Sequence, residues 1–207
     1  MNLKIIEPWT RIEDAPEGEE LLRRIERIGR VCYKSEGSIT EASARGFVER
    51  LLARGHESVI EHVSLSARIV CDRGVSHEIV RHRIASYSQE STRYCNYSQD
   101  KFDGQLSFIR PCFWAEGSEA YRLWASAMAE AERAYLSLLD AGASPQEARS
   151  VLPSSVKTEL AATMNLREWR HFFRLRTSPA AHPQMRQVAG MLLEQMREAV
   201  PVIFDTL

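Results

Sequence analysis

Two segments in which apolar and polar side chains alternate constrain the fold of this chain most strongly. Every second side chain is apolar in residues 63–71 (VSLSARIVC) and again, apart from Thr158, in residues 156–164 (VKTELAATM). A period of two is the pattern of a strand that buries one face. Strands of an all-parallel sheet are buried on both faces and read as continuous apolar runs, so alternation favours antiparallel or mixed pairing. The sequence therefore predicts an α+β fold.

Turn residues and shorter apolar patterns predict the remaining extended segments. Leu3 and Ile5 indicate a short first strand that Pro8 ends. A later strand is predicted from Leu106 to Ile109. Between them, the serine-rich stretch that begins after Arg83 is predicted to be a loop, and residues 94–98 are predicted to be extended.

Apolar residues at helical spacing predict the helices. The expected helices run from Pro16 to Val31, from about Thr40 to Gly55, from Val75 to Ile84, over residues 117–140, from Ser144 towards Pro153, over residues 165–176 and from Pro183 to Val200. The second helix has two alternative starts, an N-cap at Thr40 or a capping box of Ser38 and Glu41. Asn165 is the expected cap of the helix over residues 165–176.

Composition limits the class of protein. With 207 residues, the chain is long enough for one folded domain, so residues 1–207 are predicted to form a single domain. A formal net charge of -1 argues against a general nucleic-acid binder and against a membrane-surface protein. No apolar run reaches membrane-spanning length, and the N-terminus lacks the pattern of a signal peptide. We therefore expect a cytoplasmic protein.

The cysteines and histidines do not form a known metal-binding motif. No CxxC pair occurs among Cys32, Cys71, Cys95 and Cys112, which is typical of a reduced intracellular protein with buried thiols. His56 and His62 are close together, but an HExxH motif would need histidine at position 60 and an HxxEH motif would need it at position 58. The sequence therefore predicts no metal site. A purely structural role, in which both histidines are hydrogen-bonded near a helix end, stays open.

Two clusters of arginine indicate binding of an anion. Arg81, Arg83 and Arg93 stand among short hydroxyl side chains in residues 81–93, with Glu90 as the one acid. Guanidinium groups grip phosphate in a bidentate manner, so this composition suits a phosphate ester. A solvated turn, or cations at the negative end of a helix, would explain the same residues without a ligand.

The second cluster lies in residues 165–176, NLREWRHFFRLR. Four arginines and His171 occur there against Glu168 alone. Positions 167, 171 and 174 are three and four residues apart, so they are predicted to share one face of the helix. A chain with almost no net charge thus concentrates cations in two places, which can focus anionic ligands in a cleft.

Five blocks of sequence, in order, resemble one family. They are GHESVIEH, DRGVSHEIVRHR, the spacing RHR-x7-S from Arg81 to Ser91, ARSVLP and NLREWRHFFRLR. Together they resemble the flavin-dependent thymidylate synthases, the ThyX family. The resemblance implies an α/β fold with a central, mostly antiparallel sheet flanked by helices, and a homotetramer with shared active sites. It also implies conversion of dUMP to dTMP, with methylenetetrahydrofolate as carbon donor and NADPH as reductant through bound FAD.

The resemblance implies roles for residues at matching positions. Arg176 is implied to lie against the uracil ring as the main catalytic residue, where a fixed cation stabilises negative charge as carbon 5 becomes nucleophilic. The residues implied to bind dUMP are Glu78, Ile79, Val80, Arg81, Gln89, Glu90, Ser91, Thr92, Arg93, Arg149 and Arg176. The residues implied to bind FAD are Ser58, Arg81, His82, Arg83, Gln89, Asn165, Leu166, Arg167 and His171.

His56 and Ser91 complete the implied catalytic set. His56 is implied close to the flavin, where it guides either the folate or the nicotinamide. A serine nucleophile needs an adjacent base, and no such arrangement is visible in the sequence, so a hydrogen bond from Ser91 to substrate is favoured over covalent attack. Gln89 departs from the family, in which an acid is more usual. It keeps the hydrogen-bonding reach and loses the charge, so it predicts a slightly different grip on substrate.

Three other classes of protein fit parts of the pattern. A non-catalytic nucleotide- or flavin-binding module would use the same arginines on a phosphate. A small RNA- or DNA-binding protein would show a basic face and a steep salt dependence of binding, which the net charge argues against. A structural α+β domain with surface arginines would bind no such ligand. A bound flavin that NADPH bleaches, at a rate that responds to dUMP, distinguishes the enzyme from these alternatives.

Overall fold

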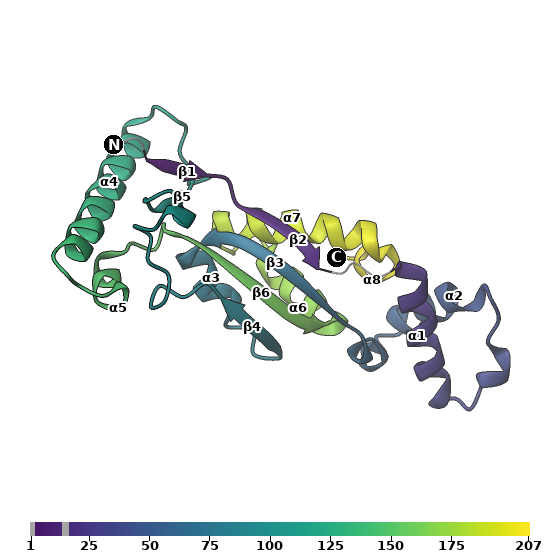
Figure 1. Cartoon of the computed structure of the whole chain (residues 1–207). Helices are drawn as coiled ribbons and strands as arrows, with labels where there is room; N and C mark the ends of the chain where they lie inside the picture. The colour runs from purple at the N-terminus through teal and green to yellow at the C-terminus, as the bar shows by residue number, and fades with distance from the viewer. Residues whose placement is uncertain (1–2, 14–16) are drawn as a thin grey trace. The chain divides into compact units, whose positions relative to one another are not determined.

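The computed structural model describes residues 3–13 and 17–207, and Figure 1 shows the helices and strands. The described chain forms two compact units. Unit 1 comprises the described part of Met1–Trp9, Ile69–Arg81 and Ser88–Leu160, and unit 2 comprises that of Thr10–Arg68, His82–Tyr87 and Ala161–Leu207. The single domain expected for residues 1–207 stays a prediction. The expected helix start at Pro16 lies outside the described residues.

Four strands form a mostly antiparallel sheet in the order β2-β3-β6-β4. They are β2 (Trp9–Glu13), β3 (Ser64–Asp72), β6 (Lys157–Asn165) and β4 (Ala85–Gln89). β3 and β6 confirm the two segments of alternating side chains, and burial alternates along the whole length of β6. Ser66 Oγ lies 2.7 Å from Thr163 Oγ1 and joins these two strands through their side chains. With helices flanking the sheet, the predicted fold class is confirmed.

Three local predictions were wrong. The serine-rich stretch contains β4 rather than a loop only, and residues 94–98 are turns rather than extended chain. The helix expected from Val75 is α3 (Arg73–Ile79), which begins earlier because Asp72 Oδ1 accepts a hydrogen bond from the Val75 amide at 2.8 Å. α3 also ends earlier, so Arg81 to Arg83 follow the helix instead of forming its last turn.

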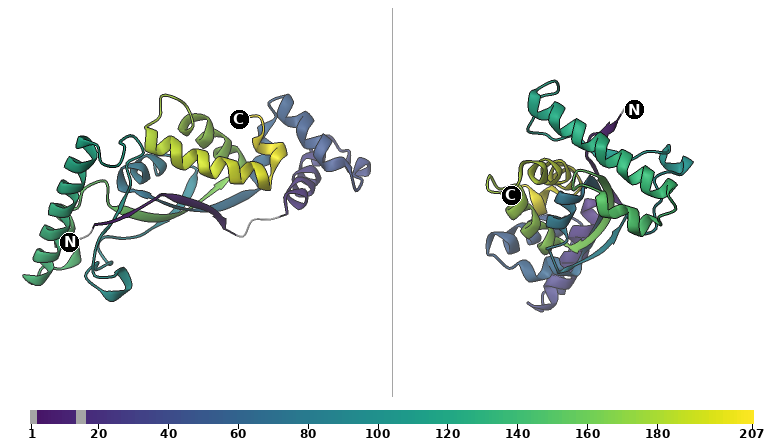
Figure 2. Two further views of the ribbon diagram at one scale, coloured as in Figure 1. Left: turned by 90° about the horizontal axis from the view of Figure 1, so that it is seen from above. Right: turned by 90° about the vertical axis from the view of Figure 1, so that its left-hand side faces the viewer.

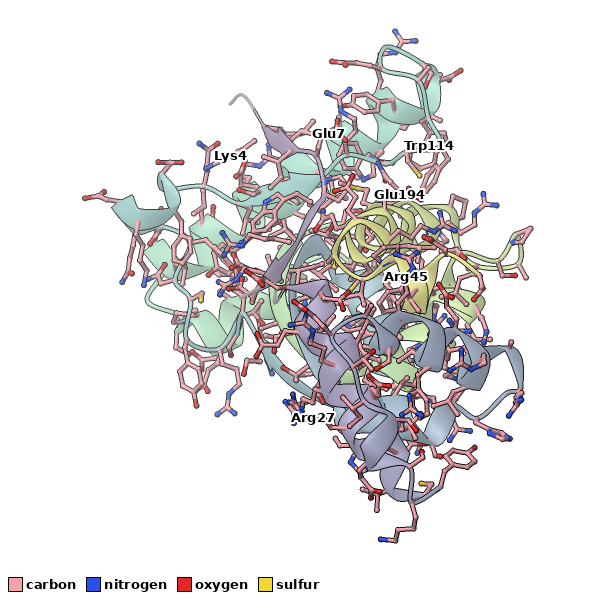
Figure 3. All side chains as sticks on the ribbon, turned by 90° about the vertical axis from the view of Figure 1, so that its right-hand side faces the viewer. Lys4, Glu7, Arg27, Arg45, Trp114 and Glu194 are labelled. Atoms are coloured by element: carbon pink, nitrogen blue, oxygen red, sulfur yellow. The ribbon has the colours of Figure 1, made fainter. Side chains whose placement is uncertain are left out.

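Unit 2 contains a pair of packed helices with a buried glutamate, Glu26, at their interface. α1 (Gly18–Val31) lies against α2 (Ser43–Ala53). Glu26 is buried there and accepts hydrogen bonds from Arg30 at 2.6 Å and from Ser43 Oγ at 2.8 Å. Neither expected cap of α2 forms, because its N-cap residue is Ala42, which makes no side-chain cap. Figure 3 shows Arg27 and Arg45 on the exposed faces of this pair.

The C-terminal helices of unit 2 pack on one another. They are α6 (Leu166–Arg176), α7 (Pro183–Ala199) and α8 (Pro201–Phe204). α6 contacts both α7 and α8 and also the 3₁₀ helix Glu57–His62, and Figure 2 shows α6 beside α7. The Trp169 indole Nε1 donates to the Leu65 carbonyl at 3.0 Å, which anchors α6 to β3. The buried aromatic face of α6 thus leaves its opposite face for other partners.

Unit 1 is built around a parallel strand pair and one long helix. β1 (Lys4–Ile6) pairs with β5 (Ser107–Ile109), as Figure 1 shows. Ile5 lies opposite Phe108 in this pair. α4 (Glu119–Asp140) begins at Ser118, whose hydroxyl accepts from the Tyr121 amide. α5 (Pro145–Ala148) and a 3₁₀ turn, Arg149–Val151, follow it. Among the described helices, none combines the length and the apolar character needed to cross a membrane.

The core of unit 1 includes a buried acid. Tyr121, Trp124 and Tyr135 of α4 pack with Phe108 of β5. Glu132 lies in the same region, 2 % exposed, and accepts a hydrogen bond from the Leu106 amide at 2.8 Å. A buried carboxylate needs such a partner, because burial without one carries a large desolvation cost. This bond ties α4 to the start of β5.

Candidate functional site

A cavity of about 520 Å³ lies in unit 2, against the face of α6 that carries the cations. It is lined by Glu57, Glu61, Ile84, Asn165, Arg167, Glu168, His171 and Arg174. Cavities of this size hold small molecules and cofactors in proteins. The lining comes from two segments that are distant in sequence, GHESVIEH and NLREWRHFFRLR, together with Ile84.

The start of α6 explains how its cations reach the cavity. Asn165 Oδ1 accepts a hydrogen bond from the Glu168 amide at 2.9 Å, which confirms the expected cap. From this start, Trp169 and Phe172 are fully buried, while Arg167 and His171 are exposed towards the cavity. The predicted common face of positions 167, 171 and 174 is confirmed, since all three side chains line one cavity.

Glu57 organises the arginines of this face. Its Oε1 lies 3.1 Å from Arg170 Nε and 3.0 Å from Arg174 Nη2, and its Oε2 lies 3.8 Å from Arg167 Nε. Arg167 also donates to Glu61 at 2.5 Å. Partial burial alone would raise the pKa of Glu57, but the hydrogen bonds and charges of Arg174 and Arg170 hold that pKa below its ordinary value. Glu57 is therefore an ionised anchor for three guanidinium groups.

His82 is the buried residue of the RHR triplet, only 5 % exposed. Its Nδ1 lies 3.1 Å from Glu168 Oε1, and its Nε2 accepts a hydrogen bond from Arg176 Nε at 3.1 Å. Burial lowers the pKa of His82 below its ordinary value; the hydrogen bond with Glu168 opposes this shift, and the charge of Arg176 adds to it. A neutral imidazole thus connects the one acid of α6 to the predicted catalytic arginine.

The other residues predicted for FAD have different surroundings. Arg83 and Ser58 are exposed, whereas the Leu166 side chain is fully buried and its amide donates to the Val63 carbonyl at 2.9 Å. Leu166 thus has no side-chain surface to offer a ligand. His56 is exposed, and its Nδ1 lies 3.2 Å from the Tyr33 hydroxyl. None of these four residues lines the 520 Å³ cavity.

The residues predicted for dUMP belong to unit 1, apart from Arg176. Gln89 is fixed, because its Nε2 donates to Ser76 Oγ and to Thr158 Oγ1, both at 3.0 Å. Glu90 accepts from the Tyr97 hydroxyl and from Lys157 Nζ, both at 2.7 Å. The end of β4 and the residues after it are thereby held in one conformation.

Among the next residues of this segment, Ser91 is half-buried and Arg93 is exposed. Ser91 Oγ accepts from the Arg93 amide at 3.3 Å, and no described hydrogen bond joins Ser91 to a base. Arg93 lies over the Tyr94 ring, with its Cζ 5.5 Å from the ring centroid. Thr92 is buried, and so is Ile79. The arginines of this set are therefore available at the surface, while two predicted contacts have little exposed side chain.

Three of the arginines predicted for dUMP, all in unit 1, are paired with no acid of the described chain. Arg81, Arg93 and Arg149 are exposed, and among residues 3–13 and 17–207 no ion pair joins them to an acid. Glu78 and Val80 are half-buried around the end of α3. Three guanidinium groups without a carboxylate partner can accept a phosphate at little cost in broken bonds.

Sequence reasoning missed several lining residues. Glu57, Glu61, Glu168, Arg174 and Ile84 border the cavity but were not among the predicted site residues. Arg174 had a usable signal, because it shares the helix face of Arg167 and His171. The glutamates had none, because their partners lie 86 to 117 residues away in sequence.

Three groups in the site also have metal-ligand chemistry. Ligand atoms of His82, Glu168 and His171 lie within 4.8 Å of one another. The surroundings disfavour a divalent cation, because Arg176 already donates to His82, and Arg167 and Arg174 line the same cavity. The hydrogen bond between His82 and Glu168 and the edge-on packing of His171 on His82 account for their proximity without an ion.

The comparisons with known proteins agree with the geometry. Residues 16–202 match the family model described as thymidylate synthase complementing protein. A flavin-dependent thymidylate synthase of Pyrococcus abyssi is 37% identical over 169 residues, covering 80% of this chain and 68% of that protein. The enzyme of the same name from Corynebacterium aurimucosum is 34% identical over 215 residues, covering 95% of this chain and 83% of that protein.

A solved structure shows the same architecture. The UMP/dUMP methylase PolB from Streptomyces cacaoi, bound with 5-Br dUMP, superposes with a TM-score of 0.79 and 25% sequence identity. The match covers 98% of this chain and 96% of that chain. Sequence and architecture therefore agree over nearly the whole length, and the chain belongs to the family of flavin-dependent thymidylate synthases.

Proposed function

We propose that this chain converts dUMP to dTMP in a reductive methylation. Methylenetetrahydrofolate supplies the carbon, and NADPH supplies the reducing equivalents through bound FAD. The observation that carries the proposal is the 520 Å³ cavity lined by one helix face of Arg167, His171 and Arg174, in a chain of this family. We place the reaction in the cytoplasm, in a homotetramer with shared active sites.

The cavity in unit 2 suits FAD. The cofactor has an anionic pyrophosphate and a flavin ring with apolar faces, and the cavity offers Arg167 and Arg174 beside the apolar Ile84. Each lining glutamate is bonded to an arginine or a histidine of the same unit, so none is an isolated negative charge. The bound flavin would carry reducing equivalents from NADPH to the transferred carbon.

The dUMP phosphate is assigned to the uncommitted arginines of unit 1. Arg81, Arg93 and Arg149 supply the positive charge, and the backbone of residues 89–92 supplies N–H groups. Gln89 and Glu90 support this segment rather than grip the substrate, since their side chains already bond within unit 1. Fixing the segment in advance lowers the entropy cost of ordering it on binding.

Arg176 is assigned to the uracil ring. A guanidinium fixed beside the ring stabilises the negative charge that develops when carbon 5 attacks the methylene carbon. Ser91 is assigned a hydrogen bond to substrate, because its described bond is to the Arg93 amide rather than to a general base. His56 is assigned a place beside folate or nicotinamide, and its exposed ring permits either.

Flavin spectroscopy with product analysis tests the proposal. The purified protein is titrated with FAD, reduced by NADPH without oxygen, and then given methylenetetrahydrofolate with dUMP or, in parallel, UMP. We expect a flavin spectrum that bleaches with NADPH and dTMP formation that requires all components. The parallel UMP reaction is included because the Streptomyces protein carries both substrates in its name. Nucleotide binding without flavin uptake would instead support the non-catalytic module.

A further inference from the structure

Hydrogen bonds join Glu168 through His82 to Arg176, and the chemistry proposed above gives Glu168 and His82 no part. Glu168 and Arg176 lie at opposite ends of α6, eight residues or roughly 12 Å apart along the helix axis. His82, from the segment before β4, bridges them with contacts of 3.1 Å on either side of its ring. The ring is buried and packs edge-on against Phe172, with centroids 5.0 Å apart.

The chemistry of the three groups fixes the direction of each hydrogen bond. Arg176 Nε has a proton and no lone pair, so it is always the donor, and His82 Nε2 must be the acceptor. A neutral imidazole that accepts at Nε2 carries its proton at Nδ1. That proton faces Glu168 Oε1, so the carboxylate accepts it. The other tautomer would bring two N–H groups together at Arg176.

We propose that Glu168 is a positioning residue that acts through His82 to fix the orientation of the Arg176 guanidinium. The carboxylate selects the Nδ1–H tautomer of His82, and this tautomer leaves Nε2 free to accept from Arg176. The proposal rests on the proposed function, because the task of Arg176 at the uracil ring belongs to that function.

Orientation matters because Nε lies within the side chain rather than at its tip. A hydrogen bond to Nε limits rotation about the bonds that precede the planar group, and so sets the plane of the whole guanidinium. Charge stabilisation by a fixed group requires no reorganisation during the reaction, whereas a mobile arginine must be ordered first. The buried His82 ring is therefore a rigid reference for a long, flexible side chain.

The other groups around His82 do not replace Glu168. The His171 ring packs edge-on against that of His82, with centroids 5.6 Å apart, and no described hydrogen bond joins the two rings. The Tyr87 hydroxyl donates to the His82 carbonyl at 2.7 Å and holds the backbone, not the ring. Burial raises the pKa of Tyr87 to about 12, and the charge of Glu168 acts in the same direction, so Tyr87 stays neutral. Glu168 is thus the acceptor in the described surroundings that sets the tautomer.

Nitrogen NMR of ¹⁵N-histidine-labelled full-length protein, without and with FAD, tests the chain directly. In the unmodified protein we expect His82 to be neutral with its proton on Nδ1. Glu168→Gln keeps the size of the side chain, but its amide can donate to Nδ1 as well as accept from it, so the Nε2–H tautomer becomes populated. We expect kcat to fall about 10–100-fold, the range found when the outer hydrogen-bond partner of a metal-bound histidine is removed. Smaller changes are expected in KM for dUMP and in FAD affinity.

Glu57→Gln is the control variant for Glu168→Gln. It neutralises a carboxylate of the same cavity that bonds Arg170 and Arg174 but not His82. We expect this variant to keep the Nδ1–H tautomer. The proposal is overturned if His82 carries its proton on Nε2 or on both nitrogens in the unmodified protein. It is also overturned if Glu168→Gln retains both the tautomer and kcat.

The readouts separate this proposal from the function on which it rests. The tautomer is measured on the protein itself and does not depend on turnover. If no dTMP forms in the unmodified protein, the proposed function fails while the tautomer measurement still decides the hydrogen-bond directions. If dTMP forms and Glu168→Gln lowers kcat without any change in tautomer, the positioning role through His82 is excluded.

Discussion

The arginines beside the cavity of unit 2 and the three assigned to dUMP in unit 1 are held in different ways. In unit 2, Arg167, Arg170 and Arg174 all contact Glu57, and Arg167 contacts Glu61 as well. In unit 1, Arg81, Arg93 and Arg149 are exposed and make no ion pair with an acid in the described chain. Arginine is therefore held in place by glutamate partners beside the cavity of unit 2, and the three arginines assigned to dUMP in unit 1 are cations without an acidic partner in the described chain.

This difference corresponds to two ways of binding an anion. Guanidinium groups pre-organised by glutamates lose less entropy when a ligand arrives, but the ligand must compete with carboxylates for their N–H groups. Uncommitted arginines attract a phosphate through charge, and this attraction weakens with salt. We accordingly expect a cofactor that remains bound in unit 2 and a substrate that exchanges readily in unit 1.

Arg176→Ala has the largest expected effect. Arg176 belongs to unit 2 by its fold, yet its proposed task concerns the uracil ring rather than an anionic group of FAD. Loss of a fixed charge that stabilises a transition state costs about 10²–10³ in kcat. We expect the variant to stay folded and yellow, with dUMP still binding by equilibrium dialysis. Full turnover in this variant would remove Arg176 from the chemistry.

Glu57→Gln is expected to have the next largest effect, on stability. Its carboxylate is the shared partner of the buried Arg170 and of Arg174, and removal of one partner of a buried pair costs about 3 kcal/mol. Because the folded-state pKa of Glu57 lies below its ordinary value, its contribution is fully present above the unfolded-state pKa and is lost as pH falls through the folded-state pKa.

Urea unfolding over a pH series measures this contribution. The difference in unfolding free energy between the unmodified protein and Glu57→Gln is expected to be greatest at neutral pH and to shrink below the ordinary glutamate value of 4.5. Glu61→Gln is the control, because Glu61 is exposed and pairs with Arg167 at the surface, where such pairs contribute about 0–1 kcal/mol. A difference that does not change with pH would contradict the role of the ionised carboxylate.

Arg167→Ala and Arg93→Ala test the comparison most directly. A hydrogen bond to a charged group contributes about 1.5–3 kcal/mol, or roughly 10–100-fold in affinity. We expect Arg167→Ala to weaken FAD binding by that factor without weakening dUMP binding, and Arg93→Ala to do the reverse. Flavin fluorescence titration and dUMP dialysis at two salt concentrations measure both, with a stronger salt dependence expected for dUMP. If either variant lost affinity for FAD and for dUMP to the same extent, the two units would not bind different ligands.

The parts of the fold that the sequence predicted are those determined by neighbouring residues. β3 and β6 followed from alternation, and α6 followed from the Asn165 cap and its cationic face. β4 was missed because its side chains alternate only between half-buried and exposed, and no apolar pattern marks it. α3 was misplaced because its start depends on the Asp72 carboxylate, whose capping bond to the Val75 amide was not predicted.

The site in unit 2 was predicted only in part. Arg167 and His171 could be assigned to one face from helical spacing, and their place on the cavity is observed. The partners that shape this cavity could not be assigned, because Glu57 meets Arg170 across 113 residues and His82 meets Glu168 across 86. Residue spacing does not predict such long-range pairs, because the two partners come together only when the sheet and α6 pack in the folded chain.

The smallest expected effect concerns the caps that begin one helix in each unit. Asn165 Oδ1 accepts from an amide of α6 in unit 2, and Ser118 Oγ accepts from an amide of α4 in unit 1. Replacement of either by alanine costs about 1 kcal/mol of stability, because one amide loses its acceptor. Only Asn165→Ala is also expected to weaken FAD binding, since α6 carries Arg167 and His171 and α4 carries no residue of the cavity. Thermal unfolding of both variants with and without FAD measures this difference. FAD is expected to raise the unfolding temperature of Asn165→Ala less than that of Ser118→Ala. An equal rise in both variants would show that FAD binding does not depend on the start of α6.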